Sequence, residues 1–367
     1  MRVPFLDLPA QYAEARHLID PAFQEILEKG AYVLGPWNQK LEADLAAAHG
    51  VRHGIALNSG TDALRIGMQA CGIGPGDEVI TTAFSFVATI ETVVQLGAVP
   101  VMVDILEDTF DIDPSLIEAA ITPRTKAILP IHLFGQLAAM DEILAIAERH
   151  NLLVIEDAAQ AVVTQQNGRF AGQFGKCAGI SFYVTKNLGA AGDGGMLLTD
   201  DDEVARRAKS LRVHGMGRER YYYDEVGYTS RMAELQAAFL HAKFQFLGDW
   251  NSRRAEIAAI YQEGLANAPF AIPTIRPGNV STWHQYTIRH PQRDAVMAHL
   301  KENGIDSAIY YPVPLHLHEP YAHYGRGGGS LPKTEKVCQE CLSLPVGHHL
   351  TDEQAHHVVK TLLAFGS

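Results

Sequence analysis

The feature that most constrains the fold is a set of seven short apolar runs in the first two-thirds of the chain, alternating with segments of helical periodicity. The runs are continuous stretches of Val, Ile and Leu, which is typical of strands buried on both faces of a parallel sheet. The chain is therefore predicted to form an α/β domain with a mainly parallel seven-stranded sheet and helices on both faces. The predicted strands are HGIALN (53–58), EVITTAF (78–84), AVPVMVDI (98–105), KAILPIHLF (126–134), LLVIED (152–157), GISFYV (179–184) and GGMLLTD (194–200).

The pattern changes near Trp250, where a long helical segment leads into a mixture of strands and helices broken by prolines. We therefore expect a large domain over residues 1–249 and a smaller C-terminal α+β domain over residues 250–367. The predicted elements of the smaller domain are helices at 252–266, 293–304, 333–343 and 351–365 and strands at 282–289 and 306–314.

Composition narrows the class of partner. The chain of 367 residues has 30 Lys and Arg against 42 Asp and Glu, a formal net charge of −12. This balance, without a Lys/Arg cluster, argues against a nucleic-acid or anionic-membrane partner, although one basic pocket for a single phosphate remains compatible with it. No apolar run approaches the roughly eighteen residues of a membrane span. The N-terminal MRVPFLDLPAQ lacks the apolar core of a signal peptide, and four cysteines make no disulfide framework, so a cytoplasmic location is expected.

Two patterns could suggest a metal site. Cys338 and Cys341 form a C-x-x-C, but they lie in KTEKVCQECLSL, which has the pattern of an amphipathic helix, and no second cysteine pair accompanies them. Their spacing fits one side of a helix. HLH (316–318) and the histidine pairs at 348–349 and 356–357 have no carboxylate or thiolate that completes a ligand set. No metal is predicted.

Three segments carry candidate chemistry, and each lies where a predicted strand ends. Ligands of open parallel sheets gather beyond the carboxyl ends of the strands. Gly60 and Thr61 join a strand to a helix whose first N–H groups favour an anion, although S-G-T is also an ordinary helix cap. Asp157 emerges from a buried strand, where a carboxylate needs a positive partner or donors, a helix cap being the alternative. Lys186 stands at a glycine-rich turn, and a surface lysine is the alternative there.

Together these three segments supply what pyridoxal phosphate requires. A helix end anchors the phosphate, an acid holds the protonated pyridine nitrogen, and a lysine amine forms a Schiff base. The protonated ring nitrogen makes the ring an electron sink for the carbanion that forms at each proton transfer. A pyridoxal phosphate enzyme is therefore the hypothesis that accounts for all three segments.

The chain also resembles a known family, the DegT/DnrJ/EryC1/StrS sugar aminotransferases, within fold type I of the pyridoxal phosphate enzymes. The resemblance covers nearly the whole length, and the order and number of the motifs make it specific. The motifs are FLDL, YVLGP, NSGTDAL, PGDEVIT, FSFVAT, AAITPRTKAI, VIEDAAQ, SFYVTKNLGAAGDGG, RMAELQAA and YYPVPLHLH.

The resemblance implies roles for individual residues around the cofactor. Lys186 would form the Schiff base and then move the proton between cofactor and substrate carbons, while Asp157 would pair with the pyridine nitrogen. Gln160 would lie near the phenolic oxygen of the cofactor, and Phe86 would stack on its ring. The phosphate would be met by Gly60, Thr61 and Ser181.

The resemblance also implies a homodimer with shared active sites. Family members carry an Asn that reaches the phosphate from the neighbouring subunit, in the segment that here reads GYTSRM. Thr229 takes that place, with Ser230 as an alternative donor, and a hydroxyl offers one donor on a shorter arm. Arg231 fits the family pattern and is a candidate for the phosphates of a sugar nucleotide.

The activity implied is transfer of an amino group from an amino acid, L-glutamate, to a keto group of a nucleotide-linked deoxysugar in a ping-pong reaction. YYPVPLHLH (310–318) is closer in spelling to family members that aminate C3 of the hexose than to those acting at C4. It would place Tyr310, Tyr311 and His316 in the pocket for sugar and diphosphate. Two alternatives remain: a ketocyclitol aminotransferase of aminoglycoside biosynthesis, and a non-catalytic cofactor-binding regulatory protein.

Overall fold

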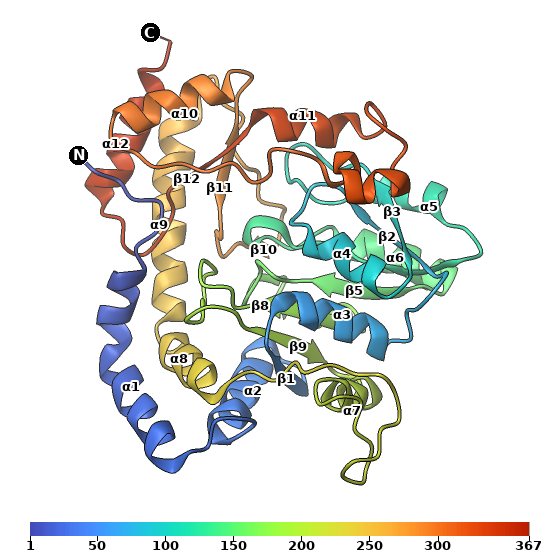
Figure 1. Cartoon of the computed structure of the whole chain (residues 1–367). Coiled ribbons are helices and arrows are strands. Elements are labelled where there is room, and N and C mark those ends of the chain that lie inside the picture. The colour runs from blue at the N-terminus through green and yellow to red at the C-terminus, as the bar shows by residue number, and fades with distance from the viewer. Residues whose placement is uncertain (367) are drawn as a thin grey trace.

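The computed structural model describes residues 1–366, and a seven-stranded sheet lies at its centre (Figure 1). All seven predicted strands are confirmed. Their spatial order is β1 (His53–Leu57), β9 (Gly195–Thr199), β8 (Cys177–Ser181), β5 (Leu153–Asp157), β4 (Thr125–Ile128), β2 (Glu78–Thr82) and β3 (Val99–Val103).

The sheet is mainly parallel, as predicted. The pairs from β8 through β5, β4 and β2 to β3 are parallel, whereas β9 runs antiparallel to both of its neighbours, β8 and β1. Six strands therefore point the same way, and their carboxyl ends meet at one edge of the sheet. This edge is where a ligand site is expected in such a fold.

Helices cover both faces of the sheet, and the strand residues alternate between two apolar clusters. On β5, Val154 packs into the cluster with α2 (Pro36–His49), α6 (Met140–His150) and α8 (Glu234–Phe244). The next residue, Ile155, packs into the cluster with α3 (Gly60–Ala70), α4 (Ala88–Gln95) and α7 (Asp202–Leu211). Because side chains alternate along a strand, Glu156 and Asp157 project to opposite faces of the sheet.

Several other elements lie outside the seven-stranded sheet. The long helix α1 (Leu8–Lys29) packs on α8. A small three-stranded sheet has the order β10 (Asn279–Val280), β6 (Gln165–Gln166) and β7 (Arg169–Phe170). The short helical segments are η1 (Pro114–Leu116), α5 (Ile117–Ala120) and η2 (Leu133–Gly135).

Residues of the C-terminal unit form a separate apolar cluster, and the ribbon of this unit, mainly orange and red, lies at one end of the molecule in Figure 1. The long helix α9 (Leu247–Leu265) connects it to α8, and β11 (Tyr286–Arg289) pairs antiparallel with β12 (Cys341–Leu344). The other elements are α10 (Arg293–Glu302), η3 (Leu315–Leu317), η4 (Glu319–Tyr324), α11 (Pro332–Glu340) and α12 (Asp352–Leu363).

The division into domains at 249/250 stays a prediction. The structure adds two facts that bear on it: position 250 lies within α9, and Val3 packs into the C-terminal cluster, with a bridge to Ile305. The first residues of the chain therefore contact the C-terminal unit.

Two predicted elements of this unit are wrong. The segment 306–314 is no strand: Ala308 makes a single bridge to Ser343, and the residues after it leave the sheet. Pro312 and Pro314 have no N–H group for a ladder, and the N–H of Leu315 instead reaches the carbonyl of Ala83 beside β2 (2.9 Å).

The helix predicted at 333–343 ends at Glu340, because its last residues form β12. Cys341 is therefore a strand residue and does not share a helix face with Cys338. Within residues 1–366, no helix combines the length and apolar character needed to cross a bilayer.

Candidate active site

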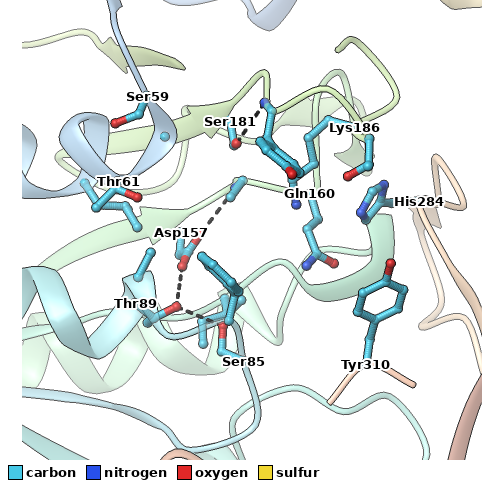
Figure 2. Close-up of a pocket in the computed structure, with 18 of the residues that line it drawn as sticks. Ser59, Thr61, Ser85, Thr89, Asp157, Gln160, Ser181, Lys186, His284 and Tyr310 are labelled. Carbon is cyan, nitrogen blue, oxygen red and sulfur yellow. Dashed lines mark hydrogen bonds between the residues drawn. The ribbon is translucent and has the colours of Figure 1, made fainter. Parts of the chain in front are cut away.

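A cavity of about 560 Å³ lies at the carboxyl edge of the sheet. Its walls come from the β1–α3 turn, the start of α4, the segments after β5 and β8, and the segment containing Tyr310 and Tyr311. Figure 2 shows Ser59 and Thr61 at one end of this cavity and His284 and Tyr310 at the other, with Asp157 and Lys186 between them. The three segments singled out in the sequence therefore meet in one place.

Lys186 lies in a tight turn that begins five residues earlier, at the end of β8. The turn is fixed by hydrogen bonds from the Lys186 N–H to the Tyr183 carbonyl and from the Ala190 N–H to the Phe182 carbonyl, both 2.8 Å. Burial of the amine lowers the pKa of Lys186 to about 8, against the charge of Asp157, which raises it. No hydrogen bond joins the Lys186 amine to another residue of the described chain. A lysine with this pKa has a substantial neutral, nucleophilic fraction near pH 8.

Asp157 is the last residue of β5 and is only 4% exposed. Its Oδ2 accepts a hydrogen bond from the Thr89 hydroxyl (2.7 Å), and its Oδ1 accepts one from the Ala159 N–H (3.2 Å). Burial raises the pKa of Asp157, and the two hydrogen bonds and the charge of Lys186 only partly oppose this rise. The carboxylate thus lies in the cavity with fewer stabilising contacts than its burial demands.

The start of α3 forms an anion cup against the end of β8. Ser59 caps the helix by accepting the Asp62 N–H (3.1 Å), while the first N–H groups of a helix have no partner within it. A Cβ at Gly60 would lie 2.5 Å from the Cβ of Ser181, so only glycine allows this approach. Thr61 and Ser181 both line the same end of the cavity. The cup suits a phosphate group.

Gln160 and Tyr311 form a fixed pair above the cavity. Gln160 Oε1 accepts the Phe134 N–H (2.8 Å), which orients the amide so that its Nε2 donates to the Tyr311 hydroxyl (3.1 Å). Burial raises the pKa of Tyr311, so the phenol stays protonated and keeps its own hydrogen for another acceptor. Phe86 stands at the rim, 55% exposed, with its ring 6.4 Å from that of Tyr311.

Four candidate site residues, Thr229, Ser230, Arg231 and His316, do not line this cavity. Thr229 is exposed and lies beside the His214 ring (3.2 Å), and Arg231 is half-buried outside the pocket. Ser230, the alternative to Thr229, is buried and donates to the Asn58 side chain (2.9 Å). These positions leave open a role in the pocket of a second subunit.

The placement of His316 in the pocket is wrong. Its side chain is fully buried, and its Nε2 lies 3.2 Å from Glu335 on α11. The alternation that suggested a pocket position requires a strand, and the chain forms the 3-10 helix η3 there instead.

Sequence reasoning missed other cavity residues, notably His284, Ser85 and Thr89. Asn187 donates to the carbonyl of Thr282 (2.8 Å), so its Oδ1 accepts from His284 Nδ1 (3.0 Å). Burial, followed by the positive charge of Lys186, lowers the pKa of His284, and the ring is neutral. FSFVAT contains two of these hydroxyl residues, but its sequence does not reveal that they face Asp157.

The fold and this site define the class. A lysine and a carboxylate in one cavity, beside a helix-end anion cup at the carboxyl edge of a mainly parallel sheet, are the features of fold type I aminotransferases. The chain belongs to the DegT/DnrJ/EryC1/StrS aminotransferase family, whose model matches residues 14–363.

Similar proteins cover nearly the full length. A "Pleiotropic regulatory protein" from Geobacillus stearothermophilus is 48% identical, over 100% of this chain and 99% of its own. A "dTDP-3-amino-3,4,6-trideoxy-alpha-D-glucose transaminase" from Streptomyces venezuelae is 44% identical, over 98% of this chain and 94% of its own. The crystal structure of S. venezuelae DesV in complex with a ketimine intermediate superposes with a TM-score of 0.96 at 44% identity, over 98% of this chain and 97% of that one.

Proposed function

We propose that the cavity holds pyridoxal 5′-phosphate, with Lys186 as its covalent attachment point. The observation that carries the proposal is the presence of Lys186, Asp157 and the anion cup in one cavity. When bound, this cofactor supplies an electron sink for the carbanion that forms when a substrate carbon loses a proton. The glycine-dependent approach of Gly60 to Ser181 and the free Lys186 amine both support the fit.

In this proposal the chain's own residues have distinct tasks. Asp157 holds a proton on the ring nitrogen through its negative charge, and Gly60, Thr61 and Ser181 bind the phosphate. Phe86 covers one face of the ring, and Gln160 orients the side that carries the phenolic oxygen. The Lys186 amine, with a pKa of about 8, would carry the proton between the substrate carbon and the cofactor carbon.

We propose that the enzyme moves an amino group from L-glutamate to the C3 keto group of a nucleotide-linked deoxysugar. The S. venezuelae relative is named as a transaminase of a dTDP-linked 3-amino sugar, which supports both the substrate class and the position. Tyr310 and Tyr311 supply aromatic faces and hydroxyl groups that suit a pyranose at the far end of the cavity. The ketocyclitol alternative would leave a diphosphate-binding Arg231 without a task.

A second candidate function has one observation in its favour. The Geobacillus stearothermophilus relative is named a regulatory protein, so a non-catalytic role for this chain is the alternative. A protein that only binds the cofactor has no need for a proton-transferring lysine next to the carboxylate. The aminotransferase proposal accounts for this pair.

We further propose a homodimer with shared active sites. Lys186 is the single Lys or Arg among the described residues that line the cavity, whereas the cofactor phosphate and a sugar diphosphate together carry several negative charges. Cationic side chains from another subunit would balance them. Thr229 and Arg231 lie outside their own cavity and are the candidates for this task across the dimer interface.

The test begins with the purified protein and pyridoxal phosphate. Borohydride reduction and peptide mapping should place the pyridoxyl adduct on Lys186; an adduct on another lysine would overturn the assignment. The pyridoxamine form is then offered 3-keto and 4-keto 6-deoxyhexose nucleotides together. We expect the 3-keto sugar to be consumed first. Prior consumption of the 4-keto sugar would refute C3, and failure with L-glutamate and every keto substrate would favour the regulatory alternative.

A further inference from the structure

A pair of buried hydroxyl groups lies behind Asp157 and has no role in the reaction described so far. Thr89, in the first turn of α4, is 1% exposed, and its hydroxyl lies 2.7 Å from Asp157 Oδ2. The Ser85 hydroxyl lies 2.8 Å from that of Thr89. Figure 2 shows the three groups joined in series by two hydrogen bonds, and all three residues line the cavity.

The direction of these hydrogen bonds follows from the chemistry of the groups. An ionised carboxylate only accepts, so the single hydrogen of the Thr89 hydroxyl points to Asp157. Ser85 must then donate to Thr89. Because Thr89 is both an acceptor from Ser85 and a donor to Asp157, its hydroxyl hydrogen is held in one direction.

The Thr89 hydroxyl affects both the orientation and the charge of Asp157. The backbone of Asp157 is already fixed, since its N–H donates to the Pro130 carbonyl and its carbonyl accepts from the His132 N–H, both 2.9 Å. The side chain has two further contacts, with Thr89 and Ala159, and the former is the shorter. A hydrogen bond to the charged form of an acid favours that form, so Thr89 opposes the effect of burial on the Asp157 pKa.

We propose that Thr89 is a positioning residue of the reaction: its hydroxyl, oriented by Ser85, keeps Asp157 ionised and turned toward the ring nitrogen of the cofactor. This role rests on the proposed function, because it is defined by the partner of Asp157. Thr89 does not touch the reacting atoms, and it acts only through the carboxylate.

The other titratable groups facing Asp157 must stay unchanged for the test to be specific. They are Lys186 across the cavity, the buried His132 behind it and the Tyr311 phenol above it. Substitution at Thr89 removes none of these groups. A change in pH dependence would therefore report on the hydroxyl alone.

The matched variants are Thr89→Val, Thr89→Ser and Thr92→Val. Thr89→Val keeps the shape and removes the hydroxyl, while Thr89→Ser restores it. Thr92 lies one turn further along α4, is fully buried, and bonds only to the backbone carbonyls of Ala88 and Thr89. Thr92→Val thus removes a buried threonine hydroxyl from the same helix without touching Asp157.

The experiment measures the glutamate half-reaction of each holoenzyme as a function of pH. We expect Thr89→Val to lower the rate constant of this half-reaction at least about tenfold, as for loss of one hydrogen bond to a charged group. The acid limb of its pH profile should move to higher pH, because Asp157 loses a donor that favours its charged form. Thr89→Ser should recover most of the rate and the original profile, and Thr92→Val should keep both.

A wild-type rate and profile for Thr89→Val, or an equal effect of Thr92→Val, would overturn the role of Thr89. If Thr89→Val fails to fold, Ser85→Ala serves as the second variant, with a smaller shift expected in the same direction and an unchanged profile counting against the proposal. Wild-type protein that neither binds pyridoxal phosphate nor consumes glutamate would refute the proposed function and this role with it. An active wild type with an unaffected Thr89→Val would refute the role alone.

Discussion

Glu156 and Asp157 are neighbours on strand β5, and both are buried, yet the protein treats them in opposite ways. Glu156, fully buried on the α2/α6/α8 face, accepts hydrogen bonds from His132 Nε2 (2.8 Å) and from the N–H groups of Gly172 (2.9 Å), Phe174 (3.0 Å) and Gly175 (2.6 Å). Asp157, on the cavity side, accepts two. The first carboxylate is saturated by the protein, and the second is not.

His132, which contacts Glu156, has a defined tautomer. The Ala138 N–H donates to His132 Nδ1 (3.2 Å), so the ring hydrogen of a neutral His132 lies on Nε2 and points to Glu156. Burial alone would raise the pKa of Glu156, but the bonds from His132 and the backbone outweigh it, and the pKa is lowered. Burial prevails at Asp157, whose pKa is raised.

These opposite shifts have opposite consequences for stability. Glu156, with a lowered pKa in the folded protein, contributes stability above its unfolded pKa, and this contribution is lost as the pH falls through its folded value. Asp157, with a raised pKa, destabilises the cofactor-free protein as the pH rises above its unfolded value. A buried carboxylate whose hydrogen bonds are complete stabilises the fold, whereas one with free acceptor positions is available to a cationic ligand.

The largest effect should come from Glu156→Gln. An amide at this position would direct its NH₂ group at backbone N–H donors, and each buried donor left without an acceptor costs about 1–3 kcal/mol of unfolding free energy. Urea unfolding near neutral pH would measure the loss, which should shrink as the pH falls through the folded pKa of Glu156. Glu118→Gln, which removes an exposed ion pair with Arg149, is the control and should leave the urea midpoint essentially unchanged. If Glu156→Gln lost no more stability than this control, the hydrogen bonds of Glu156 would not stabilise the fold.

Asp157→Asn should slow the reaction without destabilising the cofactor-free protein. We expect the glutamate half-reaction to slow by about one to two decades, since a charge-assisted hydrogen bond worth roughly 1.5–3 kcal/mol is lost. The cofactor-free variant should be as stable as wild type or more stable by at most about 1 kcal/mol, because the buried charge is gone. Stopped-flow kinetics test the predicted rate, and urea unfolding tests the predicted stability. Near wild-type turnover would mean that Asp157 only closes the turn at Ala159.

The smallest effect concerns the titration of Lys186. In the cofactor-free protein its amine should titrate at about 8, measurable by competitive acylation followed by peptide mapping. Asp157→Asn should lower this pKa, because the Asp157 charge favours the ammonium form. Glu156→Gln should leave it unchanged, since Glu156 faces the other side of the sheet. An equal shift in both variants would show that the two acids are not separated by the sheet as described.

The sequence was informative where chemistry depends on position along one strand. Seven apolar runs predicted the seven strands, and Asp157 and Lys186 followed from their places at strand ends. The contrast between Glu156 and Asp157 could not be predicted, because it depends on partners distant in the sequence: His132 and Gly172–Gly175 for one, Thr89 for the other.

The segment after residue 305 shows a second limit. Its alternation favoured a strand, but the prolines remove ladder donors, and contacts with the sheet domain bring Tyr310 and Tyr311 over the cavity while His316 is buried against Glu335. Local pattern does not encode these long-range contacts. The same holds for Thr229 and Arg231, whose proposed work lies in another subunit.

The position of β1 has a consequence for how the chain is made. β1 lies at the edge of the sheet, and its partner there is β9, so His53 pairs with Thr199. At ordinary rates of protein synthesis, roughly ten seconds pass between these two strands leaving the ribosome. During that time β1 and the start of α3 have no strand to complete them, and an unpaired apolar edge is prone to aggregation. The anion cup, although its residues Gly60 and Thr61 lie near the start of the chain, therefore forms only after more than half of the chain has been synthesised.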